Sequence, residues 1–112
     1  MKNAEIIERL FALIEERRSA DPANSYVAKL YAKGLAKIAQ KVGEEGLETA
    51  LAAVQNSKQE VVYESADLLF HMMVLWADMG LTPDDIFAEL SRREGLSGLR
   101  RSSFAPHLDA RA

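Results

Sequence analysis

Acidic side chains occur in two short, similarly spaced groups near the middle of this 112-residue sequence. Glu45 and Glu48 are three residues apart, and Glu64 and Asp67 repeat that spacing farther along the chain. On a helix, residues three apart share a face, so each pair would present two carboxylates together. Carboxylate oxygens are the ligands that Mg²⁺ and Mn²⁺ prefer in proteins. The spacing therefore indicates a divalent-metal site, provided that the two pairs meet.

A short polar turn around Asn56 separates the two acidic pairs. In an antiparallel pair of helices folded about this turn, residues equally distant from it face each other. Glu48 then faces Glu64. Likewise Glu45 faces Asp67, so the four carboxylates converge. Glu45 also falls on an apolar seam, where a buried carboxylate without a partner is costly, so a positive charge is expected beside it.

Four converging carboxylates suit chemistry at phosphorus. Mg²⁺ retains several waters, takes phosphate oxygens as ligands and can activate a water for in-line attack. Lys37 and Lys41 share a helical face with Glu44 and Glu48, where they could bind phosphates or pair with those acids. Hydrolysis of a phosphate ester or anhydride is the expected reaction. His71, four residues after the second pair, is expected to support the site rather than to bind the metal.

Composition excludes several other classes of protein. The length fits one domain, and the absence of cysteine removes disulfides, thiolate metal sites and cysteine nucleophiles. Fourteen Lys and Arg against 17 Asp and Glu argue against a nucleic-acid partner. The apolar run over 68–77 is too short to span a membrane, and the charged N-terminus does not resemble a secretory signal. A cytoplasmic protein is expected.

Helical spacing of the apolar residues extends through most of the sequence and predicts an all-α fold. Gly34, Gly43 and Gly46 fall inside the longest predicted helix, where each costs up to about 1 kcal/mol, so packing must hold that helix or a kink interrupts it. The four predicted helices cover residues 4–18, 25–54 with Ser25 as N-cap, 58–79 closed by Gly80, and 82–93 opening on Thr82 and Pro83. A domain over 1–95 and a loosely ordered tail over 96–112 are expected.

Three segments around these acids resemble a known family. They read SYVAKLYAKG over 25–34, KVGEEGLE over 41–48 and YESADLLFH over 63–71. Together they resemble the phosphoribosyl-ATP pyrophosphatases, which catalyse the second step of histidine biosynthesis and belong to the all-α, MazG-like nucleotide pyrophosphohydrolases. The resemblance covers about residues 4–93. The acidic pattern by itself identifies only the superfamily. The three segments together are more specific and indicate the family.

The resemblance implies a four-helix MazG-like bundle completed by dimerisation, with a homodimer or a higher homo-oligomer as the assembly. It also implies Mg²⁺-dependent hydrolysis of 1-(5-phosphoribosyl)-ATP to 1-(5-phosphoribosyl)-AMP and pyrophosphate, with Mn²⁺ as a substitute metal. Glu44 becomes a candidate for the water-activating base or for a ligand of a second metal. The implied metal ligands are Glu45, Glu48, Glu64 and Asp67, and the implied substrate-binding residues are Lys29, Lys33, Lys37 and Lys41.

Two alternatives share the same acidic pattern. A general pyrophosphohydrolase acting on noncanonical nucleoside triphosphates would carry the same metal site, and the segment over 25–34 would be one of the parts that distinguish it. A non-catalytic helical dimer would keep the acids as structural groups. Stabilisation by Mg²⁺ would separate this second alternative from an enzyme, because a ligand that binds only the folded chain raises its stability.

Overall fold

A computed structural model describes Asn3 and residues 5–95 of the chain. By their internal contacts the residues form two units, Met1–Thr82 and Pro83–Ala112, and each is described by itself. The described residues are helical and contain no strand, and no helix among them is long and apolar enough to cross a membrane. The first unit contains α1 (Glu5–Arg17), α2 (Tyr26–Lys33), α3 (Leu35–Val54) and α4 (Lys58–Asp78), and the second contains α5 (Pro83–Glu94).

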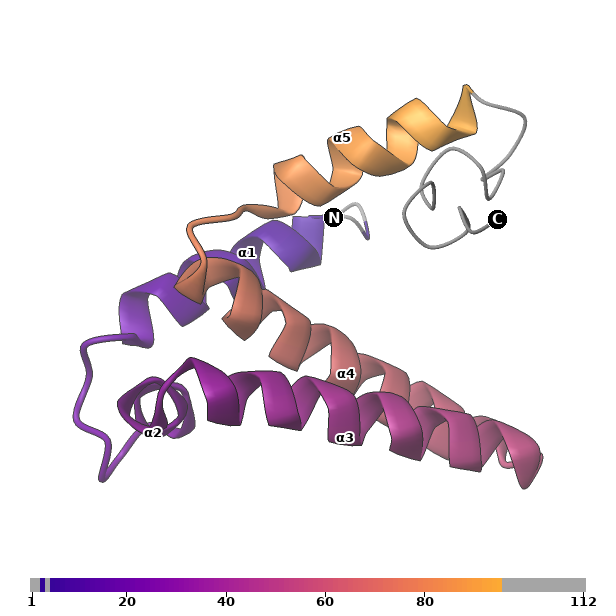
Figure 1. Ribbon diagram of the computed structural model, residues 1–112, viewed down its shortest axis with the longest axis horizontal. Coiled ribbons are helices and arrows are strands. Elements are labelled where there is room, and N and C mark those ends of the chain that lie inside the picture. Colours follow the sequence, from indigo (N-terminus) through magenta and orange to yellow (C-terminus); the bar gives the residue numbers. More distant parts are fainter. Residues whose placement is uncertain (1–2, 4, 96–112) are drawn as a thin grey trace. The chain divides into compact units, whose positions relative to one another are not determined.

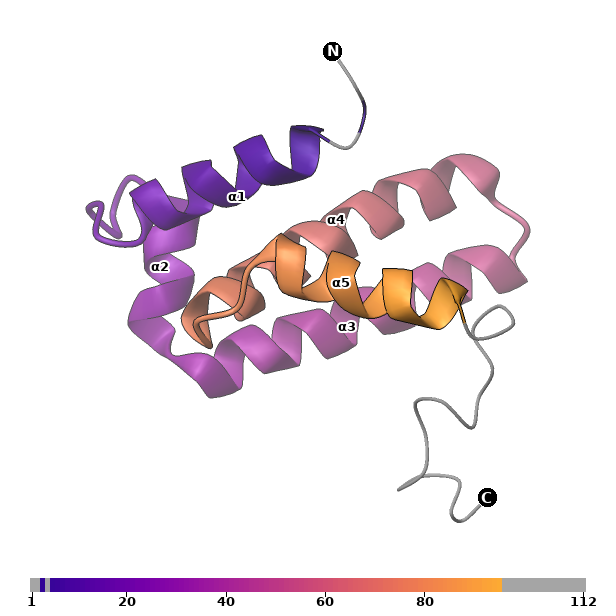
Figure 2. The same cartoon turned by 90° about the horizontal axis from the view of Figure 1, so that it is seen from above.

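The first unit is built around an antiparallel hairpin of α3 and α4. Figure 1 shows these two helices side by side, joined at one end by the short turn that contains Asn56. Helix α1 packs against α4, and Figure 2 shows α2 running across from the end of α1 to the start of α3. The buried apolar residues come from all four helices and form one core: Phe11, Ile14, Val27, Ala28, Leu30, Ile38, Ala52, Met73, Val74, Trp76 and Ala77.

The prediction of one long helix over 25–54 is wrong, because the chain breaks at Gly34. This glycine has φ 95° and ψ 171°, a conformation that residues with a Cβ rarely adopt. Its N–H donates to the carbonyls of Leu30 and Tyr31, which closes α2, and its own carbonyl accepts from the N–H of Ile38, which opens α3. The described residues therefore form five helices rather than four.

Other helix ends follow the predicted signals. Ser25 is extended, and its Oγ accepts a hydrogen bond from the Ala28 N–H at 3.1 Å, as an N-cap requires. Gly80 follows α4 with φ 77°, and its N–H donates to the Ala77 carbonyl. Pro83 opens α5 with acidic residues in the first turn. The predicted tail over 96–112 lies outside the described residues.

Arg18 and Tyr31 fasten the short α2 segment to the end of α4. The Tyr31 hydroxyl donates to the Val74 carbonyl at 2.7 Å, and burial raises the pKa of Tyr31 to about 12. The guanidinium carbon of Arg18 lies 4.5 Å from the centre of the Tyr31 ring, while its Nη1 donates to the Ala77 carbonyl at 3.0 Å. These contacts fix the direction of α2, and with it the position of the residues that α2 carries toward the hairpin.

Candidate metal centre

The turn at Asn56 sets the register of the acidic residues. Asn56 has φ 59°, and the Ser57 N–H donates back to the Ala52 carbonyl at 3.1 Å, so the chain reverses within three residues. Asparagine tolerates this left-handed conformation better than most residues. The reversal lays α4 along α3, so acidic residues at equal distances from the turn come together.

The four predicted metal ligands lie in two overlapping groups. Carboxylate oxygens of Glu45, Glu48 and Glu64 lie within 4.8 Å of one another. A second group joins Glu45 to Asp67 and to His71 within the same limit. Glu45 belongs to both groups, so it is the centre of the cluster. The convergence that the sequence predicted is therefore present in the structure.

Glu45 is a buried carboxylate with an unpaired oxygen. Only 4% of the residue is exposed, and its Oε2 lies 3.5 Å from the Lys41 Nζ. Its Oε1 is buried without any hydrogen-bond partner. Burial raises the pKa of Glu45, and the neighbouring carboxylates of Asp67 and Glu48 raise it further. Such an oxygen is costly to bury in the native state, and a cation beside it would remove that cost.

Glu64 repeats this pattern from the facing helix. Its Oε1 is also buried and has no hydrogen-bond partner. Desolvation, followed by the nearby Glu45 and Glu48 carboxyls, raises the pKa of Glu64 to about 7. Two unpaired carboxylate oxygens on facing helices, in a cluster made mainly of carboxylates, form a donor set that fits Mg²⁺ or Mn²⁺.

Lys41 supplies the positive charge that the sequence required beside Glu45. Its Nζ lies 3.5 Å from Glu45 Oε2 and 3.6 Å from Glu44 Oε1. Glu44 is exposed and accepts a hydrogen bond from Gln40 Nε2 at 2.7 Å. That bond, with the charges of Lys41 and Lys37, lowers the pKa of Glu44, so this carboxylate is ionised at the edge of the cluster. Glu44 belongs to neither of the two groups of closely spaced ligand atoms.

The four predicted substrate-binding lysines do not form one continuous stripe. The break at Gly34 places Lys29 and Lys33 on α2, where both are exposed, and places Lys37 and Lys41 on α3. Lys37 is half-buried and lies near enough to Glu44 to affect its pKa. The structure therefore brings Lys37 and Lys41 to the acidic cluster and leaves Lys29 and Lys33 on a helix with another direction.

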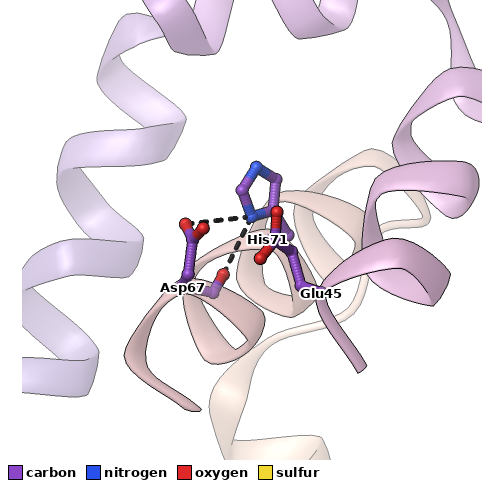
Figure 3. Close-up of side chains that lie close together, drawn as sticks. All are labelled: Glu45, Asp67 and His71. Atoms are coloured by element: carbon purple, nitrogen blue, oxygen red, sulfur yellow. Dashed lines mark hydrogen bonds and ion pairs between the residues drawn. The ribbon is translucent and has the colours of Figure 1, made fainter. Parts of the chain in front are cut away.

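His71 is engaged by hydrogen bonds on both sides of its ring. Its Nδ1 lies 2.8 Å from the Asp67 carbonyl oxygen and 3.5 Å from Asp67 Oδ1, as Figure 3 shows. Its Nε2 lies 2.7 Å from the Tyr26 hydroxyl. Tyr26 was not singled out from the sequence, because a continuous helix over 25–54 would not have carried it to α4. Recognising that a helix ends at Gly34 would have been needed to place Tyr26 beside α4.

A recess continues from the acidic cluster toward the turn. Its volume is about 270 Å³, below the range of roughly 300–1,000 Å³ typical of small-molecule sites. Leu51 in its wall is 49% exposed, so part of the lining faces outward. The recess is lined by Glu48, Leu51, Ala52, Gln55, Glu60 and Glu64.

Sequence comparison places this fold and site in a class of enzymes. This class is the all-α, MazG-like hydrolases that act on phosphoric anhydrides. The chain belongs to the phosphoribosyl-ATP pyrophosphohydrolase family, which matches residues 7–94. The family match sets aside the non-catalytic alternative.

Three relatives illustrate the similarity, and each bears the name phosphoribosyl-ATP pyrophosphatase. The protein from Rhodospirillum rubrum is 57% identical over 95 residues, which cover 85% of this chain and 81% of the relative. The protein from Azospirillum brasilense is 53% identical over 97 residues, or 87% of each chain. The protein from Novosphingobium aromaticivorans is 58% identical over 99 residues, or 88% of this chain and 92% of the relative.

Proposed function

We propose that this chain hydrolyses 1-(5-phosphoribosyl)-ATP to 1-(5-phosphoribosyl)-AMP and pyrophosphate, the second step of L-histidine biosynthesis, and that it uses Mg²⁺ to do so. The family and the names of the relatives support the substrate. The observation that carries the chemistry is the unpaired, buried Oε1 of Glu45 at the centre of four carboxylates. A cation beside that oxygen would offset the cost of burying it, and a cation among carboxylates attracts phosphate oxygens.

Glu45, Glu48, Glu64 and Asp67 would hold the metal, because their oxygens form the two overlapping groups. When bound, Mg²⁺ would neutralise charge on the phosphates and make a water more acidic. In the reaction the water oxygen joins one phosphorus of the α–β anhydride, and the bond from that phosphorus to the bridging oxygen breaks. Glu44 is ionised beside the cluster, so its carboxylate is the proposed acceptor of the water's proton.

Lysine side chains would bind the phosphates from the α3 side. Lys41 already lies beside two carboxylates, and a bound cation would lower its attraction to them and free its Nζ for a phosphate oxygen. Lys37 lies near the same acids. Lys29 and Lys33 are exposed on α2 and remain candidates for the ribose phosphate. An elongated substrate with phosphates at both ends would need cations on more than one helix.

A homodimer or larger homo-oligomer is the proposed assembly. Several large apolar side chains of the hairpin are exposed, among them Leu47 at 61% and Val62 at 63%. Such surfaces commonly mark interfaces between proteins. The recess beside the acids is small for a phosphoribosylated nucleotide and is open at Leu51. A second chain laid over this region would cover the apolar side chains and enlarge the site.

Pyrophosphate release from a panel of substrates tests this function. The enzyme would be assayed with Mg²⁺ on phosphoribosyl-ATP, ATP and several noncanonical nucleoside triphosphates at equal concentration. A kcat/KM for phosphoribosyl-ATP that exceeds the others by two or more orders of magnitude supports the proposal. Comparable values across the panel would assign the chain to the general nucleoside triphosphate pyrophosphohydrolases instead.

A further inference from the structure

Tyr26 is fixed at its hydroxyl end and open at its ring. A surface tyrosine ordinarily packs its ring against the protein and points its hydroxyl at water. Here the hydroxyl lies 2.7 Å from His71 Nε2, and burial raises the pKa of Tyr26. Phe70 lies beside the ring, with centroids 6.4 Å apart, yet 48% of Tyr26 is exposed. The ring is therefore held in place while much of its surface remains available to a ligand.

His71 connects the Tyr26 ring to the metal centre. Figure 3 shows Nδ1 of the imidazole facing Asp67, at 3.5 Å from its Oδ1, and the other nitrogen pointing away. That other nitrogen is the one beside the Tyr26 hydroxyl. Besides burial, the charges of Lys41 and Asp67 act on the pKa of Tyr26, so both lie near its hydroxyl. In a nucleotide one sugar separates the base from the phosphates, so a nucleotide with its phosphates at the metal centre has its base within reach of this ring.

Tyr31 provides a comparison within the same helix. Its hydroxyl also bonds to α4 at 2.7 Å, through the Val74 carbonyl. Its ring, however, is covered by a planar cation, because the guanidinium carbon of Arg18 lies 4.5 Å from the ring centre. The negative face of an aromatic ring attracts such a cation. The exposed ring of Tyr26 offers the same kind of surface to a planar cation from outside the chain.

The substrate of the proposed function carries a planar cation. In 1-(5-phosphoribosyl)-ATP the second ribose is attached to atom N1 of the adenine. A substituent on that nitrogen makes the base an amidinium, which is positively charged near neutral pH, whereas the adenine of ATP is neutral. Both bases are flat and can stack on an aromatic side chain. Only the charged base adds an attraction of the kind that Arg18 has for Tyr31.

We propose that the Tyr26 ring stacks on the N1-substituted adenine of the substrate and favours this charged base over the neutral adenine of ATP. Tyr26 is then a specificity-determining residue, and its hydrogen bond with His71 holds the ring in place for the base. The inference rests on the proposed function, which supplies the substrate. It adds a cause for the selection of phosphoribosyl-ATP over ATP, since both present the same triphosphate to the metal centre.

The test uses AMP and 1-methyl-AMP as probes. The methyl group reproduces the charged base, and neither nucleotide contains an anhydride, so neither is hydrolysed. Titration of the full chain in Mg²⁺, followed by ¹H NMR, would give the dissociation constants and the shifts of the base protons, which move upfield above an aromatic ring. Tyr26→Leu removes the ring, and Tyr26→Phe keeps the ring but loses the hydroxyl. Tyr63→Leu, at a tyrosine of α4 that is 64% exposed, is the matched control.

We expect upfield shifts of the base protons with the unsubstituted chain, which should bind 1-methyl-AMP about 3- to 30-fold more tightly than AMP, the range of a cation–π contact. Tyr26→Leu should weaken the binding of 1-methyl-AMP by about 5- to 100-fold and remove the preference. Tyr26→Phe should keep the upfield shifts and most of the preference. Tyr63→Leu should match the unsubstituted chain. In turnover, the ratio of kcat/KM for phosphoribosyl-ATP to that for ATP should fall in Tyr26→Leu.

Equal binding of the two nucleotides by the unsubstituted chain, or base protons that do not move upfield, would overturn the inference, and neither result depends on the folding of a variant. A Tyr26→Phe protein as weak as Tyr26→Leu would assign the effect to the hydroxyl and overturn it too, as would equal losses in Tyr26→Leu and Tyr63→Leu. A chain that binds both nucleotides as expected but does not hydrolyse phosphoribosyl-ATP would overturn the proposed function and leave the base-stacking site standing.

Discussion

Lys41 Nζ lies 3.5 Å from Glu45 Oε2, four residues away on the same helix. The same ammonium lies 3.6 Å from Glu44, so one positive charge is shared between two carboxylates while Glu48, Glu64 and Asp67 stand close by. The second oxygen of Glu45 is buried without a partner. Lys41 therefore compensates only part of the negative charge of the cluster, and the remainder is what a divalent cation would neutralise.

Saturating Mg²⁺ should stabilise the folded chain. A ligand at 100 times its dissociation constant contributes about 2.7 kcal/mol, which for a domain of this size corresponds to an increase in Tm of roughly 10–20 °C. Thermal unfolding followed by circular dichroism with Mg²⁺ and with EDTA measures it. Equal midpoints under the two conditions would contradict a metal centre.

Glu64→Gln should raise the Tm of the metal-free protein and abolish most of the gain from Mg²⁺. The substitution removes a carboxylate whose pKa is raised to about 7 by desolvation and by the adjacent Glu45 and Glu48 carboxyls. The same melting experiment measures both effects. Glu16→Gln, an exposed position on α1, is the control and should change neither midpoint. A Glu64→Gln protein with a full response to Mg²⁺ would remove Glu64 from the ligand set.

Gly34→Ala should destabilise the chain by about 1–3 kcal/mol, because its φ of 95° is unfavourable for a residue with a Cβ. No other atom would lie within 4 Å of the new Cβ, so the cost is conformational. Urea unfolding gives the change in the free energy of unfolding. Gly43→Ala is the matched control, since Gly43 is inside α3 with open space around it, and it should stabilise the chain by up to about 1 kcal/mol. The free energy of unfolding should therefore fall in Gly34→Ala and rise in Gly43→Ala. Changes of the same sign would contradict a conformational role for Gly34.

The sequence was sufficient to predict the acidic cluster but not the course of the chain around it. Equal spacing about Asn56 was enough to bring Glu45 and Asp67 together, because a tight turn between two helices leaves little freedom in their register. An interruption by Gly34, Gly43 or Gly46 was one of two alternatives, and the sequence did not show that Gly34 alone ends a helix. Whether a glycine is tolerated or ends a helix depends on tertiary contacts, and here Arg18 and Tyr31 hold α2 in its own direction.

Arg18→Ala should lower the free energy of unfolding by about 1–2 kcal/mol. It removes a charged donor to the Ala77 carbonyl and the cation above the Tyr31 ring. Urea unfolding again measures the change. Arg17→Ala, at an exposed neighbouring position, should have an effect within about 0.5 kcal/mol of zero. Similar losses in the two variants would show that the contacts of Arg18 with α4 contribute nothing specific.

Leu47→Glu should dissociate the proposed oligomer. A carboxylate placed on an apolar side chain that is 61% exposed in one chain would be desolvated if a second chain covers it. Sedimentation velocity at several protein concentrations measures the assembly. Ala12→Glu adds the same charge to an exposed position on α1 and should leave the assembly unchanged. A monomeric unsubstituted chain, or a Leu47→Glu chain that assembles normally, would contradict the proposed interface.

The role of the carboxylate cluster in catalysis is tested by steady-state release of pyrophosphate from phosphoribosyl-ATP, compared between the unsubstituted chain and Glu45→Gln at saturating Mg²⁺. Glutamine keeps the shape of Glu45 but removes its negative charge, and Glu45 is the residue common to the two groups of close ligand atoms. A metal centre built around Glu45 predicts a loss of at least about 100-fold in kcat/KM, of the order found when a charge-stabilising group is removed from an active site, with helical content retained. A folded Glu45→Gln protein with normal turnover, or full turnover in EDTA, would contradict it.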